Sequence, residues 1–446
     1  MCVAKIETVE SLQPLYRYIG MVERHRDAGR TARHRSTKIP SSLRVVGCLV
    51  AALIAMVSAA AQDIPLPEIP SVAKRPAPIQ FAPWREMDQT EEGTEYLEEF
   101  PSPVTSPFSP NNTVPLRIFM PVNPGMKIPV VLILHYWGAT DLKNERAMAQ
   151  ELNRANIAAA VMTLPYHLTR TPTGHHSGDL AIEPDPRKMV LTMTQAVLDV
   201  RRSLDFLETR PEFDQTHVGL SGTSLGALVA ELAFGVDDRI SHVAFVLGGA
   251  DIAHIVWTSS LLVRQRDALI RRGFTEEKLH QSIEVIEPLR YLPSRRSAPS
   301  LVIGGQYDTV INQQSTQELI ACLTSPRVLW LDTGHYGGIF VQRRLMREVA
   351  RFFQTEFTGS SFNAPERVYA PTIRIGVKVD SGNGFDLGVG LDLLKFDKKG
   401  DTFTTLFVTP RGPQLFLGRS IAQGFSLGAI ASTRKSGVAL LWSAVL

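Results

Sequence analysis

Cysteine is scarce in this chain, with three residues among 446. Cys2 and Cys48 lie near the N-terminus, and Cys322 is the one cysteine of the remaining sequence. A single cysteine cannot form an internal disulfide bond, so a disulfide-stapled scaffold is excluded for the main body. That part of the chain must be stabilised by a hydrophobic core, for which it is amply long.

A marked excess of either charge is also missing. The chain has 47 Lys and Arg residues against 44 Asp and Glu residues, a net charge of +3. Nine of the basic and four of the acidic residues fall within residues 1–61, so the remainder is close to neutral. Nothing in this balance favours a polyanionic partner, and we predict no binding to nucleic acid.

One apolar run approaches the length of a membrane span. Lys38 and Arg44 precede the uncharged residues 45–61, which end in small side chains before Gln62. This pattern is typical of a secretory signal peptide cleaved near Ala61. The run is shorter than the roughly 20 residues of a membrane helix. We predict export to the periplasm or beyond, without a stable membrane span after cleavage. An uncleaved signal would leave a membrane anchor, and Met1 and Met21 both remain possible start sites.

The rest of the chain changes character twice. Residues 62–112 form a proline-rich N-terminal extension, of which we predict residues 62–84 to be an extended linker or a strap over the surface. Residues 113–358 alternate continuous apolar runs with amphipathic segments, which predicts an α/β fold with a mostly parallel sheet and helices on both faces. Residues 251–298 read as a mostly helical insertion on the carboxyl side of a strand. We expect this insertion to cap the active site and to set substrate specificity.

Residues 365–446 follow a period of two instead. Ile373, Ile375 and Val377 alternate with Arg374 and Gly376, and similar runs follow between glycine-containing turns. The pattern predicts an antiparallel β-rich accessory module of roughly six strands. Its function stays open.

Residues 222–226, Gly-Thr-Ser-Leu-Gly, are the most informative motif. They connect an apolar strand to an apolar helix and place Ser224 at the tip of a sharp turn. Such a turn exposes a serine hydroxyl as a nucleophile, and the glycines allow strand and helix to approach closely. The backbone N–H of Leu225, at the helix N-terminus, is then a candidate oxyanion donor.

A nucleophilic serine needs a base and an orienting acid. Asp308 follows one predicted strand and His335 follows the next, so both should lie at the carboxyl edge of the sheet beside Ser224. Two other acids stay open, Asp251 after an earlier strand and Asp332 just before His335. Asp308 alternatively serves as the N-cap of the following helix.

The order Ser224, Asp308, His335 resembles that of the α/β-hydrolases, and the resemblance covers residues 114–356. Leu164-Pro165-Tyr166-His167 and the serine motif are similar to those of the dienelactone hydrolase and acetyl-xylan-esterase-like branch. Dienelactone hydrolases use a cysteine nucleophile, whereas this chain has a serine. The resemblance therefore implies ester hydrolysis more strongly than dienelactone chemistry.

The loop His135-Tyr136-Trp137-Gly138 follows a strand and should supply the second oxyanion donor. Many family members have glycine where this chain has Tyr136, so we favour the N–H of Trp137 and keep that of Tyr136 as the alternative. His135 is expected to be structural.

Four side chains are candidate substrate-binding residues: Tyr136, His167, Arg170 and Trp257. His167 and Arg170 could instead brace their loop against Asp179, and Trp257 could belong to the core. No ligand spacing predicts a metal site, and we expect no cofactor.

Together these features predict an exported serine hydrolase that cleaves carboxylic esters through a Ser-His-Asp triad and an acyl-enzyme. The substrate would be a small-molecule or polymeric ester, and the oligomeric state stays open. The alternatives are a peptidase or another acyl hydrolase of the same fold, or a non-catalytic binding protein on a hydrolase scaffold.

Overall fold

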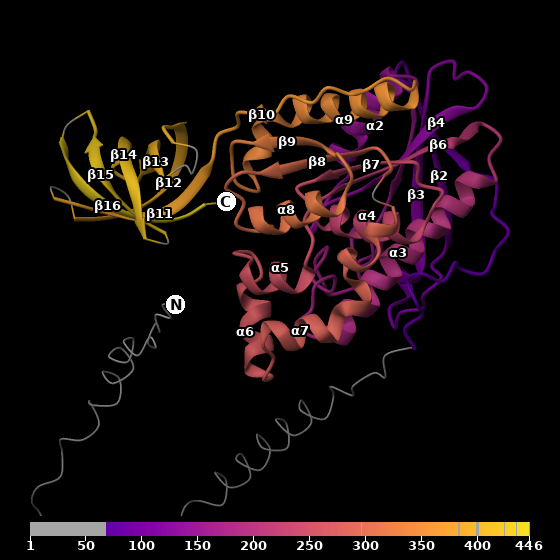
Figure 1. Cartoon of the computed structure of the whole chain (residues 1–446), viewed down its shortest axis with the longest axis horizontal. Coiled ribbons are helices and arrows are strands. Elements are labelled where there is room, and N and C mark those ends of the chain that lie inside the picture. The colour runs from indigo at the N-terminus through magenta and orange to yellow at the C-terminus, as the bar shows by residue number, and fades with distance from the viewer. Residues whose placement is uncertain are drawn as a thin grey trace, which may run out of the picture. The chain divides into compact units, whose positions relative to one another are not determined.

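The structure is a computed structural model and describes residues 68–445, apart from residues 296, 382–383, 398–400, 423 and 434 (Figure 1). The predicted signal peptide, with Cys2, Cys48 and both candidate start sites, lies outside the described residues. Among the described residues, no helix combines the length and the hydropathy needed to cross a bilayer.

The first part of the described chain is built on a ten-stranded sheet, in the order β1-β2-β3-β5-β4-β6-β7-β8-β9-β10. From β5 to β10 the neighbouring strands are parallel, whereas β1, β2, β3 and β5 pair antiparallel. The predicted mostly parallel α/β fold is confirmed. The strands are β1 (Arg85–Thr90), β2 (Gly93–Pro101), β3 (Thr113–Pro121), β4 (Ile128–Leu134), β5 (Ala158–Met162), β6 (Phe213–Thr223), β7 (His242–Val246), β8 (Ser300–Gly305), β9 (Arg327–Leu331) and β10 (Arg367–Val368).

Helices cover both faces of this sheet (Figure 1). On one face α2 (Lys143–Arg154) and α9 (Gln342–Phe357) pack on a core that includes Val131, Ala159 and Phe353. On the other face α3 (Pro186–Glu208), α4 (Leu225–Val236) and α8 (Gln313–Cys322) pack on a second core. The central strands are buried on both faces, which explains their continuous apolar sequence.

The N-terminal extension departs from the prediction. Instead of only a proline-rich linker, β1 and β2 form a hairpin that adds two strands to the sheet, with β2 paired to β3. The proline content of the flanking residues hid this hairpin. Along β2, Leu97 and Phe100 are buried, and buried Glu95 is paired by Arg117 and Arg146.

The insertion at residues 251–298 is helical, as predicted. It contains α5 (Ile252–Thr258), α6 (Val263–Arg271) and α7 (Glu276–Ile283), followed by short 3-10 turns. Contacts between α7 and α3 place the insertion on the α3 side of the sheet (Figure 1).

The C-terminal module is a closed antiparallel barrel of six strands. Its strands are β11 (Ile373–Asp380), β12 (Gly384–Lys395), β13 (Thr402–Thr409), β14 (Gly412–Ala422), β15 (Phe425–Ala431) and β16 (Ser436–Val445). The interior contains a small apolar cluster with Phe403 and Phe407.

Charged side chains also lie inside the barrel. Buried Arg374 pairs with buried Asp392 at 2.8 Å, and Lys378, 1% exposed, pairs with Asp386 at 3.3 Å. Many large apolar side chains of the barrel point outward instead, and all six strands contribute some of them. They include Ile375, Val379, Phe385, Leu387, Val389, Val408, Leu415, Leu417, Phe425, Leu427, Val438, Leu440 and Trp442.

Candidate active site

The turn between β6 and α4 has the shape that the sequence predicts. Ser224 adopts φ 55° and ψ −115°, an uncommon conformation for a residue with a side chain. A Cβ at position 222 would lie 2.0 Å from the carbonyl oxygen of Gly226. A Cβ at position 226 would lie 2.5 Å from the carbonyl oxygens of Leu134 and His135. Both positions therefore require glycine, because any side chain would push the helix away from β4 and β6.

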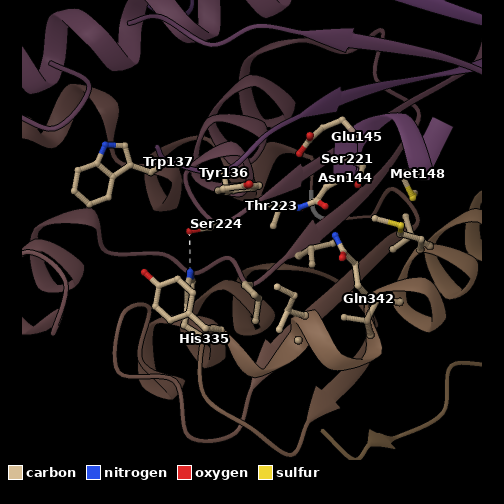
Figure 2. A pocket seen from close by; sticks show the side chains of 18 of the residues that line it. Tyr136, Trp137, Asn144, Glu145, Met148, Ser221, Thr223, Ser224, His335 and Gln342 are labelled. Atoms are coloured by element: carbon tan, nitrogen blue, oxygen red, sulfur yellow. Dashed lines mark hydrogen bonds between the residues drawn. The ribbon is translucent and has the colours of Figure 1, made fainter. Parts of the chain in front are cut away.

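Three predicted residues meet at the carboxyl edge of the sheet. Ser224 Oγ lies 3.0 Å from Nε2 of His335, and Nδ1 of His335 lies 2.7 Å from Oδ2 of Asp308 (Figure 2). Asp308 follows β8 and His335 follows β9, the next strand in the sheet. Both distances fall within hydrogen-bond range. This arrangement suits general-base activation of the serine.

Asp308 also organises its own loop. Its Oδ1 accepts hydrogen bonds from the backbone N–H groups of Val310 and Ile311, at 2.8 and 3.0 Å. The alternative that Asp308 is the N-cap of the following helix is wrong, because Asn312 caps α8 by accepting from the N–H of Ser315 at 2.9 Å. The two bonds hold the carboxylate in place while its other oxygen faces His335.

The two rival acids lie elsewhere. Asp251 is the N-cap of α5, where it accepts from the N–H of His254 at 3.0 Å, and it lies 3.7 Å from His280. Asp332 interacts with Tyr307, where burial together with the neighbouring Asp332 raises the pKa of the phenol. Neither carboxylate is within hydrogen-bond distance of His335.

Three backbone N–H groups beside the cavity are candidate oxyanion donors. Those of Leu225, Tyr136 and Trp137 make no hydrogen bond to any described residue. All three residues follow the carboxyl ends of neighbouring strands, β6 and β4, and Tyr136 and Trp137 line the cavity with Ser224. The choice of Trp137 over Tyr136 as the second donor stays a prediction.

Buried histidines brace this loop. Nε2 of His135 accepts from the N–H of Leu164, and Nε2 of His167 accepts from the N–H of Gly138, both at 3.0 Å. Burial lowers the pKa of His135 to about 3 and that of His167 to about 4. Both rings therefore stay neutral near pH 7, which their roles as both donor and acceptor require.

The structure contradicts the predicted substrate-binding role of three of the four candidates. His167 and Arg170 are fully buried, so neither can contact a substrate. Arg170 pairs with Asp199 at 2.8 Å, not with Asp179, and donates to the carbonyl oxygen of Asn111. Trp257 packs against the core of the α3 side and does not line the cavity beside Ser224. All three stabilise the structure around the site.

A cavity of about 410 Å³ opens beside Ser224 and His335. Tyr136, the fourth predicted substrate-binding residue, lines it together with Trp137. Much of its wall is apolar. Met148 of α2, Leu345, Met346 and Val349 of α9, and Ile339 just before α9 contribute to it, and so do Leu247 after β7 and Ile373 at the start of β11. Leu261 also lines the cavity and comes from the insertion at residues 251–298. That the insertion sets substrate specificity stays a prediction.

The polar residues of the cavity wall were not predicted. Asn144 and Glu145 on α2 and Gln342 on α9 line the cavity, and Figure 2 shows them on the opposite side of Ser224 from Trp137. The sequence offered one signal for Glu145. It lies on an amphipathic helix with the buried residues Met148, Ala149 and Leu152, where a carboxylate is unexpected.

Comparison with protein families matches residues 146–337 to the family described as Serine hydrolase (FSH1). The matched range contains Ser224, Asp308 and His335. Comparison with curated proteins gave no match.

Several solved structures are similar to this chain. Acetyl xylan esterase from Paenibacillus sp. R4 is 18% identical, with 61% of this chain and 88% of that chain covered and a TM-score of 0.49. Acetyl xylan esterase 1 from Thermoanaerobacterium sp. JW/SL YS485 is 15% identical, with 60% and 87% covered and a TM-score of 0.45. Est1E from Butyrivibrio proteoclasticus is 14% identical, with 53% and 93% covered and a TM-score of 0.40. Residues 146–337 are thus similar to a serine hydrolase family, and the mostly parallel sheet with the sharp turn at Ser224 has the α/β-hydrolase fold.

Proposed function

We propose that the chain is an esterase that hydrolyses carboxylic esters through an acyl-enzyme, with Ser224 as nucleophile, His335 as general base and Asp308 as the orienting acid. The observation that carries this proposal is the continuous hydrogen-bonded path from Ser224 Oγ through the His335 imidazole to Asp308 Oδ2. Ser224 and His335 line one mostly apolar cavity.

In the first half of the reaction, His335 removes the Ser224 proton as Oγ attacks the ester carbonyl carbon. The N–H groups of Leu225 and Trp137 stabilise the negative charge on the carbonyl oxygen. The C–O bond to the alcohol then breaks, and His335 donates its proton to the departing alkoxide. Asp308 holds the ring so that Nε2 faces Ser224 and stabilises the imidazolium.

In the second half, water attacks the acyl carbon while His335 accepts its proton. The carboxylic acid leaves, and Ser224 regains its hydrogen. We assign the mostly apolar cavity to the acyl group of the substrate. This group stays attached to Ser224 after the alcohol has left, and Ser224 lines the cavity.

A panel of p-nitrophenyl esters from acetate to octanoate tests this function. We expect hydrolysis at neutral pH, with a rate that depends on the acyl chain. A matched panel of p-nitroanilides tests the peptidase alternative, because the proposed esterase should leave these amides uncleaved, whereas a peptidase should cleave them. A binding protein on a hydrolase scaffold would hydrolyse neither panel, and that result would refute the proposal.

We also propose that the protein is exported and processed near Ala61, on the basis of the signal-like residues 45–61. Expression of the full chain followed by N-terminal sequencing of the exported product tests this. A mature terminus near Gln62 would support it, and an intracellular product that retains residues 1–61 would refute it.

A further inference from the structure

Glu145 places a carboxyl group in a mostly apolar part of the cavity wall. It lies in the first turn of α2 and is 4% exposed, and its neighbours in the cavity wall include Met148, Leu345 and Val349. Its Oε2 is buried and has no hydrogen-bond partner among the described residues. Glu145 also forms no ion pair with any described residue. A buried polar atom without a hydrogen-bond partner destabilises the folded state, so such a group in a native structure requires an explanation.

The groups around Glu145 do not satisfy it. The pKa of Glu145 is raised to about 7, chiefly by burial; a hydrogen bond from its own backbone N–H opposes the rise, and the charge of Asp141 adds a smaller contribution to it. The carboxyl is therefore substantially protonated near neutral pH. In that state it can both donate and accept a hydrogen bond. Tyr136 lies close enough for the charge of Glu145 to contribute to the raised pKa of the phenol, behind the larger effect of burial.

Glu145 is not an isolated polar group. Asn144 and Gln342 also line the cavity, and both are half-buried. In Figure 2 the Glu145 carboxyl and the two amides lie on the same side of the Ser224–His335 pair, with Tyr136 between Ser224 and Glu145. We call Asn144, Glu145 and Gln342 the polar wall. An acyl group attached to Ser224 that extends past Tyr136 would reach this wall.

We propose that the cavity selects an acyl group that carries a hydroxyl, and that the polar wall binds this hydroxyl, with Glu145 as the specificity-determining residue. This inference depends on the proposed esterase function and names its substrate class. A hydroxyl fits the site because it donates one hydrogen bond and accepts others, which matches a carboxyl beside two amides. The apolar remainder of the wall fits the carbon chain between the ester and the hydroxyl.

Paired esters test the inference on the full chain. For hexanoate and octanoate, the p-nitrophenyl ester of the plain acid is compared with that of the acid hydroxylated at its last carbon, and each rate is corrected for release of p-nitrophenol without enzyme. We expect kcat/KM for the hydroxylated ester of at least one pair to exceed that of the plain ester by about tenfold or more. A site built to bind a hydroxyl discriminates against the analogue that lacks it.

Variants of Glu145 test whether this residue causes the preference for the hydroxylated ester. Glu145→Leu should lower the ratio of the two kcat/KM values by about tenfold, mainly through KM for the hydroxylated ester. Glu145→Gln keeps a donor and an acceptor and should retain most of the ratio. Because the ratio compares two esters on one preparation, partial misfolding of a variant cancels. Glu151→Gln is the matched control, since Glu151 is on the same helix, does not line the cavity and pairs with Arg154.

Each of the remaining outcomes would overturn either the hydroxyl preference or the esterase function. Equal kcat/KM for plain and hydroxylated esters in the wild-type protein would overturn the inference. So would a ratio that Glu145→Leu leaves unchanged. Faster turnover of the corresponding esters that carry an amino group in place of the hydroxyl would show that the polar wall binds a cation. That result would overturn the assignment of a hydroxyl. If no ester is hydrolysed and a fluorophosphonate does not label Ser224, the esterase function itself has failed. Labelling and turnover without a hydroxyl preference would refute the specificity alone.

Discussion

The central strands of the hydrolase domain bury apolar side chains, whereas the C-terminal barrel buries charged side chains and exposes apolar ones. In the central strands β4 and β5, nearly every side chain is apolar and buried. In the barrel, Arg374 and Lys378 are buried inside, while Ile375 and Val379, which alternate with them on β11, are 44% and 48% exposed. An alternating pattern shows that the two faces of a strand differ, but it does not show which face is inside. A charged interior is possible here because the charges are paired.

This difference leaves the two regions with different surfaces. The barrel carries outward apolar side chains on all its strands, an amount that monomeric proteins rarely expose to water. The hydrolase domain exposes scattered apolar side chains, such as Met87, Met126 and Ile270, and has an apolar-lined cavity beside Ser224. In the barrel, substitution of a buried charged residue should therefore destabilise the fold, whereas substitution of an exposed apolar residue should have little effect. In the hydrolase domain, the largest effects are expected at the catalytic residues.

The largest effect is expected in the catalytic site. Asp308→Asn should lower kcat for p-nitrophenyl acetate by about 10⁴-fold, because an amide in this place favours the wrong tautomer of His335. The matched variant Asp251→Asn removes a carboxylate that caps α5 and should leave kcat within a few-fold of wild type. A larger loss of kcat from Asp251→Asn than from Asp308→Asn would show that the acid is misassigned.

Inside the barrel, Arg374→Met should lower the free energy of unfolding by about 3 kcal/mol, because it leaves the Asp392 carboxylate buried without its cation. The double variant Arg374→Met with Asp392→Leu removes both charges and should be less destabilised than the single variant. Guanidinium unfolding of the full chain measures both. If the single variant were as stable as wild type, the charged interior would not be held by this pair.

Acid should weaken the hydrolase domain through its buried histidines. Folding keeps His135 and His167 neutral down to about pH 3 and 4, whereas in the unfolded chain they bind protons near pH 6.5. The unfolded state then binds more protons in this window, so the free energy of unfolding falls as the pH falls. Each ring should contribute about 2 kcal/mol of this loss between pH 6.5 and 5.

A variant isolates this contribution from that of Glu145 and Glu231, whose raised pKa values act in the opposite direction. The decrease in unfolding free energy between pH 7 and 5 should be smaller for His167→Gln than for wild type. An identical decrease in both proteins would mean that His167 is not the group protonated on unfolding.

The smallest effect is expected on the outer face of the barrel. Leu387 is 60% exposed, so Leu387→Lys should change the free energy of unfolding by no more than about 0.5 kcal/mol. It should also reduce binding of the dye ANS, which reports exposed apolar surface. Destabilisation as large as that of Arg374→Met would show that this face is packed rather than exposed.

Much of the hydrolase fold could be predicted because buried parallel strands have continuous apolar sequences and because catalytic groups follow strand ends. Ser224, Asp308 and His335 met where this reasoning places them. The cavity wall could not be predicted, since Glu145 and Gln342 come from two helices nearly 200 residues apart whose packing no local pattern records. The full burial of His167 and Arg170 depends on distant partners, Gly138 and Asp199, in the same way.

The hairpin β1–β2 was missed for a different reason. Its strands lie between proline-rich stretches, and β1 is exposed along its whole length, so it carries no apolar alternation. Its pairing partner, β2, is in turn stabilised by β3 and by Arg146 on α2. Long-range pairing rather than local propensity determines this edge of the sheet.

Reaction with a fluorophosphonate, followed by mass spectrometry of the labelled peptide and repeated on Ser224→Ala, shows whether Ser224 is the nucleophile. We expect one labelled residue, Ser224, and a loss of both labelling and ester hydrolysis in the variant, with kcat falling by about 10⁶-fold. Labelling at another serine, or ester hydrolysis that survives in Ser224→Ala, would contradict it.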